Sequence, residues 1–395
     1  MQPEEEVIRT FLQVALALNK AVGQQKGIEP LLSTATYDYG VATPSWGWEE
    51  IGRKVEEVEA GLEVLPPRRR EYVRDLLQAF RTMVREGLGE DIPYAERVAT
   101  YLQVPGERVP QATVQALEDE LRALLVEAGY PDDLSVAIPQ WRERQTVQGQ
   151  ALVDLARAFL ERARQETERR IMPLPPGHRV VLSFPQNYPY RGYSDYARDY
   201  QGRVFLNGDI GWEVPSLKHV LCHEAFPGHQ TYSALREWCY REGRLPVEAT
   251  LYFSNTPITP IVEGMAEIGQ EALGLVETVD DRIYDVYNRF CSAVSTNLAF
   301  DCNADGMDKE TAVARLMETT FVSRVFAEKR YHFWTDPLWC TGFPHYWYGR
   351  ELMRECYARM KGAGRLREFF QMVYTEPHTV RSLREAVQSS LAEGE

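Results

Sequence analysis

One nine-residue segment, at 221–229, constrains the fold of this chain more than any other. It reads Leu-Cys-His-Glu-Ala-Phe-Pro-Gly-His, so His223 and His229 are six residues apart. In a regular α-helix that spacing separates two residues by about 9 Å along the axis and rotates them by roughly 120°. Pro227 and Gly228 disfavour a continuous helix between them. We therefore predict that the helix bulges or breaks here and that His229 turns back toward His223.

These histidines predict a metal site. Zinc sites use neutral imidazoles and carboxylates as ligands, leave one position open for water, and need a nearby Glu to move a proton. His223 and His229 are the predicted imidazole ligands of a Zn²⁺ ion. Glu263, which opens a second acidic segment at 263–267, is the predicted third ligand. Glu224 is the predicted general base and acid.

A second ligand set is compatible with the same residues. His219 and His223 are four apart and would share one face of an undistorted helix. Glu263 and Glu267 are also one turn apart, so one of them can ligate while the other orients an imidazole. The spacing alone leaves open whether His219 or Glu267 replaces a proposed ligand.

Composition excludes several classes of protein. The 395 residues carry a net charge of −14, with acidic and basic residues mixed rather than in blocks, which argues against a nucleic-acid partner. The start of the chain is acidic, unlike a secretory signal, and no apolar stretch is long enough to cross a membrane. Six cysteines without a CxxC pair favour reduced thiols. We expect a soluble, cytoplasmic protein without membrane partners.

The apolar periodicity predicts a mainly α fold. Region 1–170 is expected to be a helical scaffold, with an amphipathic helix at 7–18 and further helices at 49–63, 67–86, 92–102, 114–128 and 146–169. Region 171–395 is expected to hold a small β-sheet, with strands at 179–184 and 203–207, next to the metal-binding helix. Helices then return at 216–226, 229–242, 260–273, 279–300, 309–319, 323–334 and 346–362, with a final pair toward 391. Both regions are expected to pack as one unit.

The segment 223–229 resembles the HExxPGH signature of the bacterial family called domain of unknown function 885, which is grouped with the glutamate-zincin metallopeptidases. The segment 262–266 is similar to the family's EGWA element, and 330–331 with 346–349 are similar to its RY and YxxG elements. Asp301 with 308–312 resembles its Asp-containing helix entry. The resemblance covers about 203–381. The chain departs from the family at Gln230, where another histidine is usual, and at 301–305, where the usual DTGxH is absent.

The resemblance implies a helical, zincin-like peptidase. His223, His229 and Glu263 would hold the metal, and Glu224 would be the general base and acid. Tyr331 or Tyr346 would donate a hydrogen bond to the oxyanion.

Other side chains are candidates for supporting roles. Asp301 and Asp305 could orient a ligating imidazole. Arg330 or Arg350 could bind a substrate carboxylate with two hydrogen bonds, as carboxypeptidases and dipeptidases require. His345 adjoins a cluster of tyrosines and is the best candidate among the remaining histidines.

The function expected from the sequence is zinc-dependent hydrolysis, with a peptide or small amide as substrate. Two alternatives remain: hydrolysis of another amide or ester by the same residues, or metal binding by a helical protein without turnover. The sequence indicates no oligomeric state.

Overall fold

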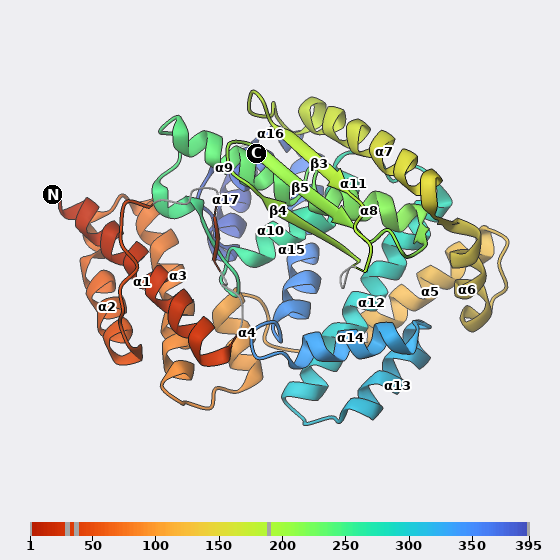
Figure 1. Cartoon of the computed structure of the whole chain (residues 1–395), viewed down its shortest axis with the longest axis horizontal. Helices are drawn as coiled ribbons and strands as arrows, with labels where there is room; N and C mark the ends of the chain where they lie inside the picture. Colours follow the sequence, from red (N-terminus) through yellow and green to blue (C-terminus); the bar gives the residue numbers. More distant parts are fainter. Residues whose placement is uncertain (1, 28–31, 35–38, 188–190, 393–395) are drawn as a thin grey trace.

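The computed structural model of the chain describes residues 2–27, 32–34, 39–187 and 191–392 and is mainly helical with a small sheet, as predicted (Figure 1). The first half holds seven helices among the described residues: α1 (Pro3–Lys26), α2 (Trp48–Gly61), α3 (Pro67–Gly87), α4 (Tyr94–Leu102), α5 (Gln111–Glu127), α6 (Leu134–Gln145) and α7 (Gly149–Arg170). A short 3-10 helix, Leu62–Val64, follows α2. The six helices expected here are confirmed, and α6, which contains Pro139, was not predicted.

Three strands form the sheet that precedes the signature segment. They are β3 (Arg179–Ser183), β4 (Gly192–Tyr196) and β5 (Gln201–Leu206), in the order β3-β5-β4. β3 runs parallel to β5, and β4 runs antiparallel to it, with Tyr193 opposite Phe205. The sequence predicted β3 and β5 but not β4. The strand order places β4 at one edge of the sheet.

Two short strand pairs join the halves of the chain. β1 (Leu32–Thr34) pairs with β7 (Leu251–Phe253), and β2 (Thr146–Val147) pairs with β6 (Trp212–Glu213), both antiparallel. Each pair brings a strand from region 1–170 against one from region 171–395, and the buried apolar residues of both regions form one continuous core.

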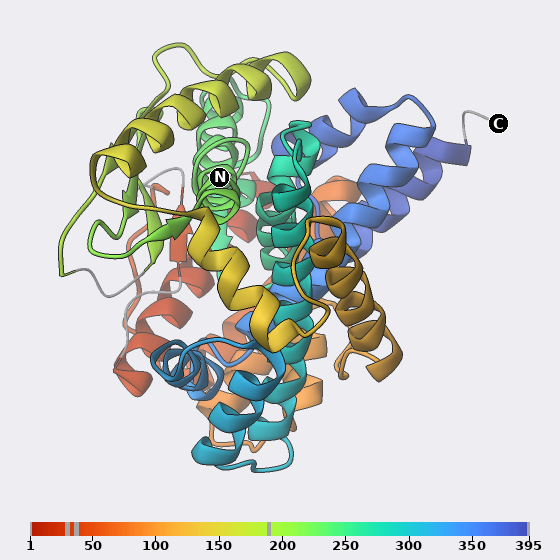
Figure 2. The ribbon, with the colours of Figure 1, turned by 90° about the vertical axis from the view of Figure 1, so that its right-hand side faces the viewer.

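The second half continues with helices. They are α8 (Val214–Glu224), α9 (His229–Arg241), a 3-10 helix (Val247–Thr250), α10 (Thr259–Glu267), α11 (Gly269–Ala272), α12 (Val279–Asn303), α13 (Lys309–Thr320), α14 (Arg324–Thr335), α15 (Gly342–Gly362), α16 (Leu366–Thr375) and α17 (Val380–Ala392). Figure 2 shows α12 running through the height of the molecule. No helix in the described part of the chain is both long and apolar enough to cross a membrane.

The packing of these elements places the candidate site at the centre. β4 packs against both α8 and α9, and α10 lies between α8 and α15. The signature segment thus has the edge strand on one side and α10 on the other.

Candidate metal centre

The predicted helix break at Pro227 and Gly228 is confirmed. α8 ends at Glu224 and α9 begins at His229, with an irregular turn between them. The turn folds back tightly, because the amide of Gly228 donates a 2.9 Å hydrogen bond to the carbonyl of Cys222. A Cβ at Gly228 would lie 1.7 Å from the carbonyl oxygen of His223. Only glycine fits this position, and the turn brings His229 back onto His223.

Helix α10 presents Glu263 to the two histidines, and close helix packing fixes its position. α10 crosses α15 where two glycines meet: a Cβ at Gly264 would lie 2.1 Å from the Gly349 carbonyl oxygen, and a Cβ at Gly349 would lie 2.3 Å from that of Pro260. The two backbones are therefore in contact, and this contact sets the position of the helix that carries Glu263.

The three predicted ligands converge. His223 Nε2 lies 3.1 Å from His229 Nε2 and 3.4 Å from Glu263 Oε2, and His229 Nε2 lies 3.6 Å from the same oxygen. Three ligands on a tetrahedral zinc ion, with bonds of 2.0–2.1 Å, lie about 3.3 Å apart. Glu263 Oε2 is buried and has no hydrogen-bond partner among the described residues. This donor set fits zinc in both chemistry and spacing.

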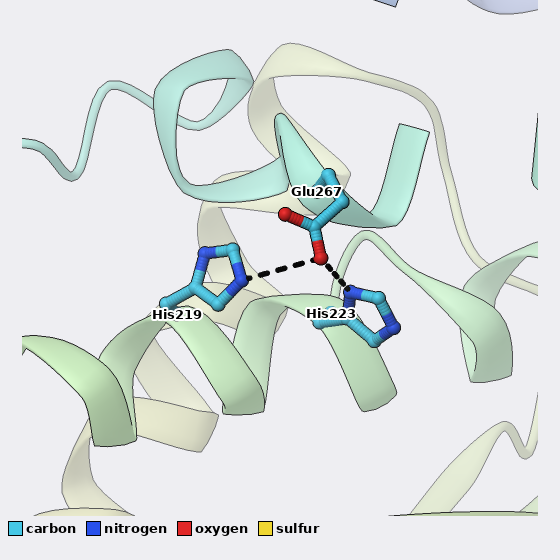
Figure 3. A group of neighbouring side chains, drawn as sticks. All are labelled: His219, His223 and Glu267. Atoms are coloured by element: carbon cyan, nitrogen blue, oxygen red, sulfur yellow. Dashed lines mark ion pairs between the residues drawn. The ribbon is translucent and has the colours of Figure 1, made fainter. Parts of the chain in front are cut away.

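The alternative group also exists, but it uses the other nitrogen of His223. Glu267 Oε1 lies 3.2 Å from His223 Nδ1 and 3.6 Å from His219 Nε2 (Figure 3). A ligating imidazole commonly directs its second nitrogen to a carboxylate, which fixes its tautomer. The two groups are therefore compatible, with Glu267 behind His223 and Glu263 in front of it.

Glu267 is in turn held by buried partners. Its Oε2 accepts hydrogen bonds from Asn288 at 3.0 Å and from Arg350 at 3.1 Å. Arg350 is 1% exposed and also contacts Asp285. Arg350 is thus committed to two carboxylates, so the suggestion that it binds a substrate carboxylate was wrong.

The charges of the cluster shift the pKa values of its members. Burial lowers the pKa of His223, but the carboxylates of Glu263 and Glu267 outweigh it and raise that pKa well above its ordinary value. Burial raises the pKa of Glu263 and of Glu267, but neighbouring imidazoles, with Arg350 beside Glu267, hold both pKa values well below the ordinary range. Both carboxylates are therefore ionised at neutral pH, the form in which a carboxylate binds metal.

The predicted base, Glu224, lies at the last turn of α8 beside the edge strand. Ser194 of β4 donates a 2.6 Å hydrogen bond to Glu224 Oε2. Its Oε1 has no hydrogen-bond partner among the residues that the structure describes. Ser194 is a contact that sequence reasoning missed, because its strand was not predicted.

The two predicted tyrosines differ in position. The Tyr346 ring on α15 lies 6.3 Å from the His223 ring, whereas the ring of Tyr331 on α14 lies 6.2 Å from that of His332. Burial, followed by the charge of Glu263, raises the pKa of Tyr346 well above its ordinary value, so its hydroxyl stays protonated. The structure thus brings the Tyr346 ring to the cluster, and it shows neither a ring contact nor a side-chain hydrogen bond between Tyr331 and the described residues of the cluster.

Three further candidates are placed as follows. His345 is buried, its ring lies 4.5 Å from that of Tyr346, and burial lowers its pKa to about 4. Asp301 and Asp305 both pair with Arg108 in an exposed cluster. The suggestion that these two aspartates orient a ligating imidazole was therefore wrong.

A cavity of about 200 Å³ opens beside the cluster. His229 and Glu263 form part of its wall, and the rest comes from β4, α9 and the segment around β7. It is rich in aromatic side chains, including Tyr193, Tyr196, Tyr232 and Tyr252. Tyr252 also donates a 3.4 Å hydrogen bond to Glu263 Oε1, a contact that nothing in the sequence singled out among 21 tyrosines.

Comparison with known proteins identifies the fold but no family. No family model matches the chain, and no curated protein matches it. A protein of Colwellia psychrerythraea, provisionally called a lipoprotein, matches with a TM-score of 0.58 and 15% identity over 88% of this chain and 68% of its own. A Shewanella oneidensis protein of unknown function, also provisionally called a lipoprotein, matches with a TM-score of 0.52 and 16% identity over 86% and 72%. This chain shares its fold with both.

Proposed function

We propose that this chain is a zinc-dependent hydrolase, a peptidase of the glutamate-zincin type acting on peptides or small amides. The observation that carries the proposal is the convergence of His223 Nε2, His229 Nε2 and Glu263 Oε2 beside the Glu224 carboxylate. The resemblance of 223–229 to the HExxPGH signature supports the same assignment. The six cysteines are unpaired, which supports a cytoplasmic location as part of this proposal.

The proposed chemistry divides between the ion and the side chains. Bound zinc supplies Lewis-acid polarisation of a carbonyl and acidifies water at its open position. Glu224 accepts a proton from the attacking water on its unpartnered Oε1 and passes it to the leaving nitrogen as the C–N bond breaks. The water oxygen becomes part of the new carboxyl group.

Two other side chains assist these steps. The neutral Tyr346 hydroxyl donates a hydrogen bond to the carbonyl oxygen as negative charge develops there. Glu267 Oε1 lies 3.2 Å from His223 Nδ1 and would favour the tautomer whose Nε2 is unprotonated and able to bind a metal.

The proposal is tested with purified protein, a panel of peptides, non-peptide amides and esters, and a chelator. We expect about one zinc ion per chain by elemental analysis, and peptide hydrolysis that the chelator abolishes. Glu224→Gln should keep its zinc and lose activity by about 10²-fold or more. Hydrolysis confined to esters or non-peptide amides would replace the peptidase assignment. Bound zinc without any turnover would favour the metal-binding alternative.

A further inference from the structure

One arginine near the cluster lacks an anionic partner. Arg330, on α14, is partly buried between two phenylalanine rings, with Cζ 4.8 Å from the ring centroid of Phe326 and 4.7 Å from that of Phe343. It makes no ion pair or hydrogen bond with the residues that the structure describes. By contrast, Arg350 pairs with Glu267 and Asp285.

The described residues around Arg330 offer no anion in exchange for the hydration that partial burial removes. Cation–π contacts return only part of what a guanidinium loses when it leaves water, and a buried cation normally has an acid or several carbonyls as partners. Burial lowers the pKa of Arg330, yet a guanidinium stays charged at neutral pH. The two rings fix the plane of this cation and leave its N–H donors for a ligand.

Ring contacts connect Arg330 to the metal cluster. Phe343 and Tyr346 are three residues apart on α15, with ring centroids 6.0 Å apart, and the Tyr346 ring lies 6.3 Å from that of His223. The Glu267 carboxylate is also close enough to act on Arg330: burial lowers the pKa of this arginine, and the charge of Glu267 raises it. The guanidinium is therefore linked to His223 through the rings of Phe343 and Tyr346, the tyrosine proposed to meet the scissile carbonyl.

We propose that Arg330 binds the free C-terminal carboxylate of a peptide substrate, which makes the protein an exopeptidase that releases a short C-terminal product. This inference rests on the proposed function. An arginine held in one plane presents two parallel N–H groups to a carboxylate, the arrangement that recognises a chain end and rejects a neutral amide. Water adds to the acyl carbon, the C–N bond breaks, and the released amine keeps the proton delivered by Glu224.

The test pairs each peptide with its C-terminally amidated form. In the zinc-loaded wild type we expect amidation to lower kcat/KM by about 10–10²-fold, the worth of a charge-assisted hydrogen-bond pair. Arg330→Gln should lose a similar factor on the free peptide and change little on the amidated one. Amidating the peptide and replacing Arg330 should therefore lower kcat/KM together by about as much as either change alone. Arg330→Lys keeps the positive charge but loses the paired N–H groups of the guanidinium. Its kcat/KM on the free peptide should therefore lie between the values of the wild type and Arg330→Gln.

A matched control lies on the same helix. Arg324 is exposed and paired with Glu310 and Glu328. Arg324→Gln should keep the wild-type preference for the free carboxylate. Mass spectrometry of the products should show cuts at a fixed distance from the C-terminus. Thermal melts check that each variant folds. If Arg330→Gln does not fold, Arg330→Lys replaces it in the comparison of free and amidated peptides.

A second measurement does not depend on turnover. Glu224→Gln protein, loaded with zinc, should bind the free peptide about tenfold or more tightly than the amidated one by calorimetry, and a further Arg330→Lys change should reduce that preference. Equal binding of the two peptides, or internal cuts indifferent to amidation, would overturn the inference while leaving the peptidase proposal intact. Failure of zinc-loaded wild type to cleave any peptide would overturn the proposed function instead.

Discussion

The ring of Tyr346 lies 6.3 Å from that of the predicted ligand His223, and its hydroxyl has no hydrogen-bond partner among the described residues. Because it would interact most strongly with charge that exists only in the transition state, Tyr346→Phe should lower kcat by about 10²–10³-fold with little change in KM. Zinc content should not change. Steady-state kinetics of this variant beside Tyr331→Phe separates the two candidates, and a larger loss in Tyr331→Phe would reverse the assignment.

The partly buried side chain of His178 should make the stability of the folded chain depend on pH, whether or not a metal is bound. Neither ring nitrogen has a hydrogen-bond partner, the ring packs 5.4 Å from that of Phe226, and burial, with the charge of Arg164, lowers its pKa to about 4. As pH falls through 6.5 the unfolded chain takes up a proton that the folded chain refuses, so stability should fall between pH 6.5 and 4.

Urea unfolding of metal-free protein at pH 7 and pH 5 measures this effect. The wild type should lose roughly 1–2 kcal/mol more than His178→Leu between the two values. Equal losses in both proteins would show that His178 is not responsible.

At the scale of elements, the crossing of α10 and α15 depends on two glycines. A Cβ at Gly349 would press on the Pro260 carbonyl, so Gly349→Ala should destabilise the fold by about 1–3 kcal/mol. Gly362, at the end of the same helix, has open space around it, and Gly362→Ala should be neutral or stabilise by up to ~1 kcal/mol. Denaturant unfolding measures the stability of both variants. Similar losses of stability in the two would argue against a close backbone contact at Gly349.

The sequence predicted most elements because their apolar spacing is regular. It missed β4, since Gly192–Tyr196 is a polar edge strand without the alternation of a half-buried one. It also missed α6, in which Pro139 obscures the helical pattern. The break at Gly228 was predictable because proline and glycine act through local backbone geometry.

At the scale of the whole molecule, zinc should stabilise the folded chain, because its ligands come together only when α8, α9 and α10 are packed. Zinc at about 100 times its Kd would add about 2.7 kcal/mol, which should raise Tm by several degrees. Glu263→Gln should show a much smaller rise. Calorimetric scans with zinc and with chelator measure the difference, and an equal rise in both proteins would place the ion elsewhere.

The parts of the site that sequence reasoning missed are those set by long-range packing. His223, Glu224 and His229 lie in one segment, so their pattern was visible. Ser194 and Tyr252 reach the cluster from distant strands, and no local spacing announces them. Likewise, only the packed structure separates Glu263 from Glu267, by showing which face of His223 each occupies.

The glycine contact between α10 and α15 has a consequence for how such a protein can diversify. Main chain sets the position of Glu263, whereas aromatic side chains from β4 and α9 line the adjoining cavity. Replacing Tyr193 or Tyr232 would therefore reshape what the cavity accepts without moving the proposed metal ligands. If the proposed function holds, substrate selectivity can change while the catalytic residues keep their positions.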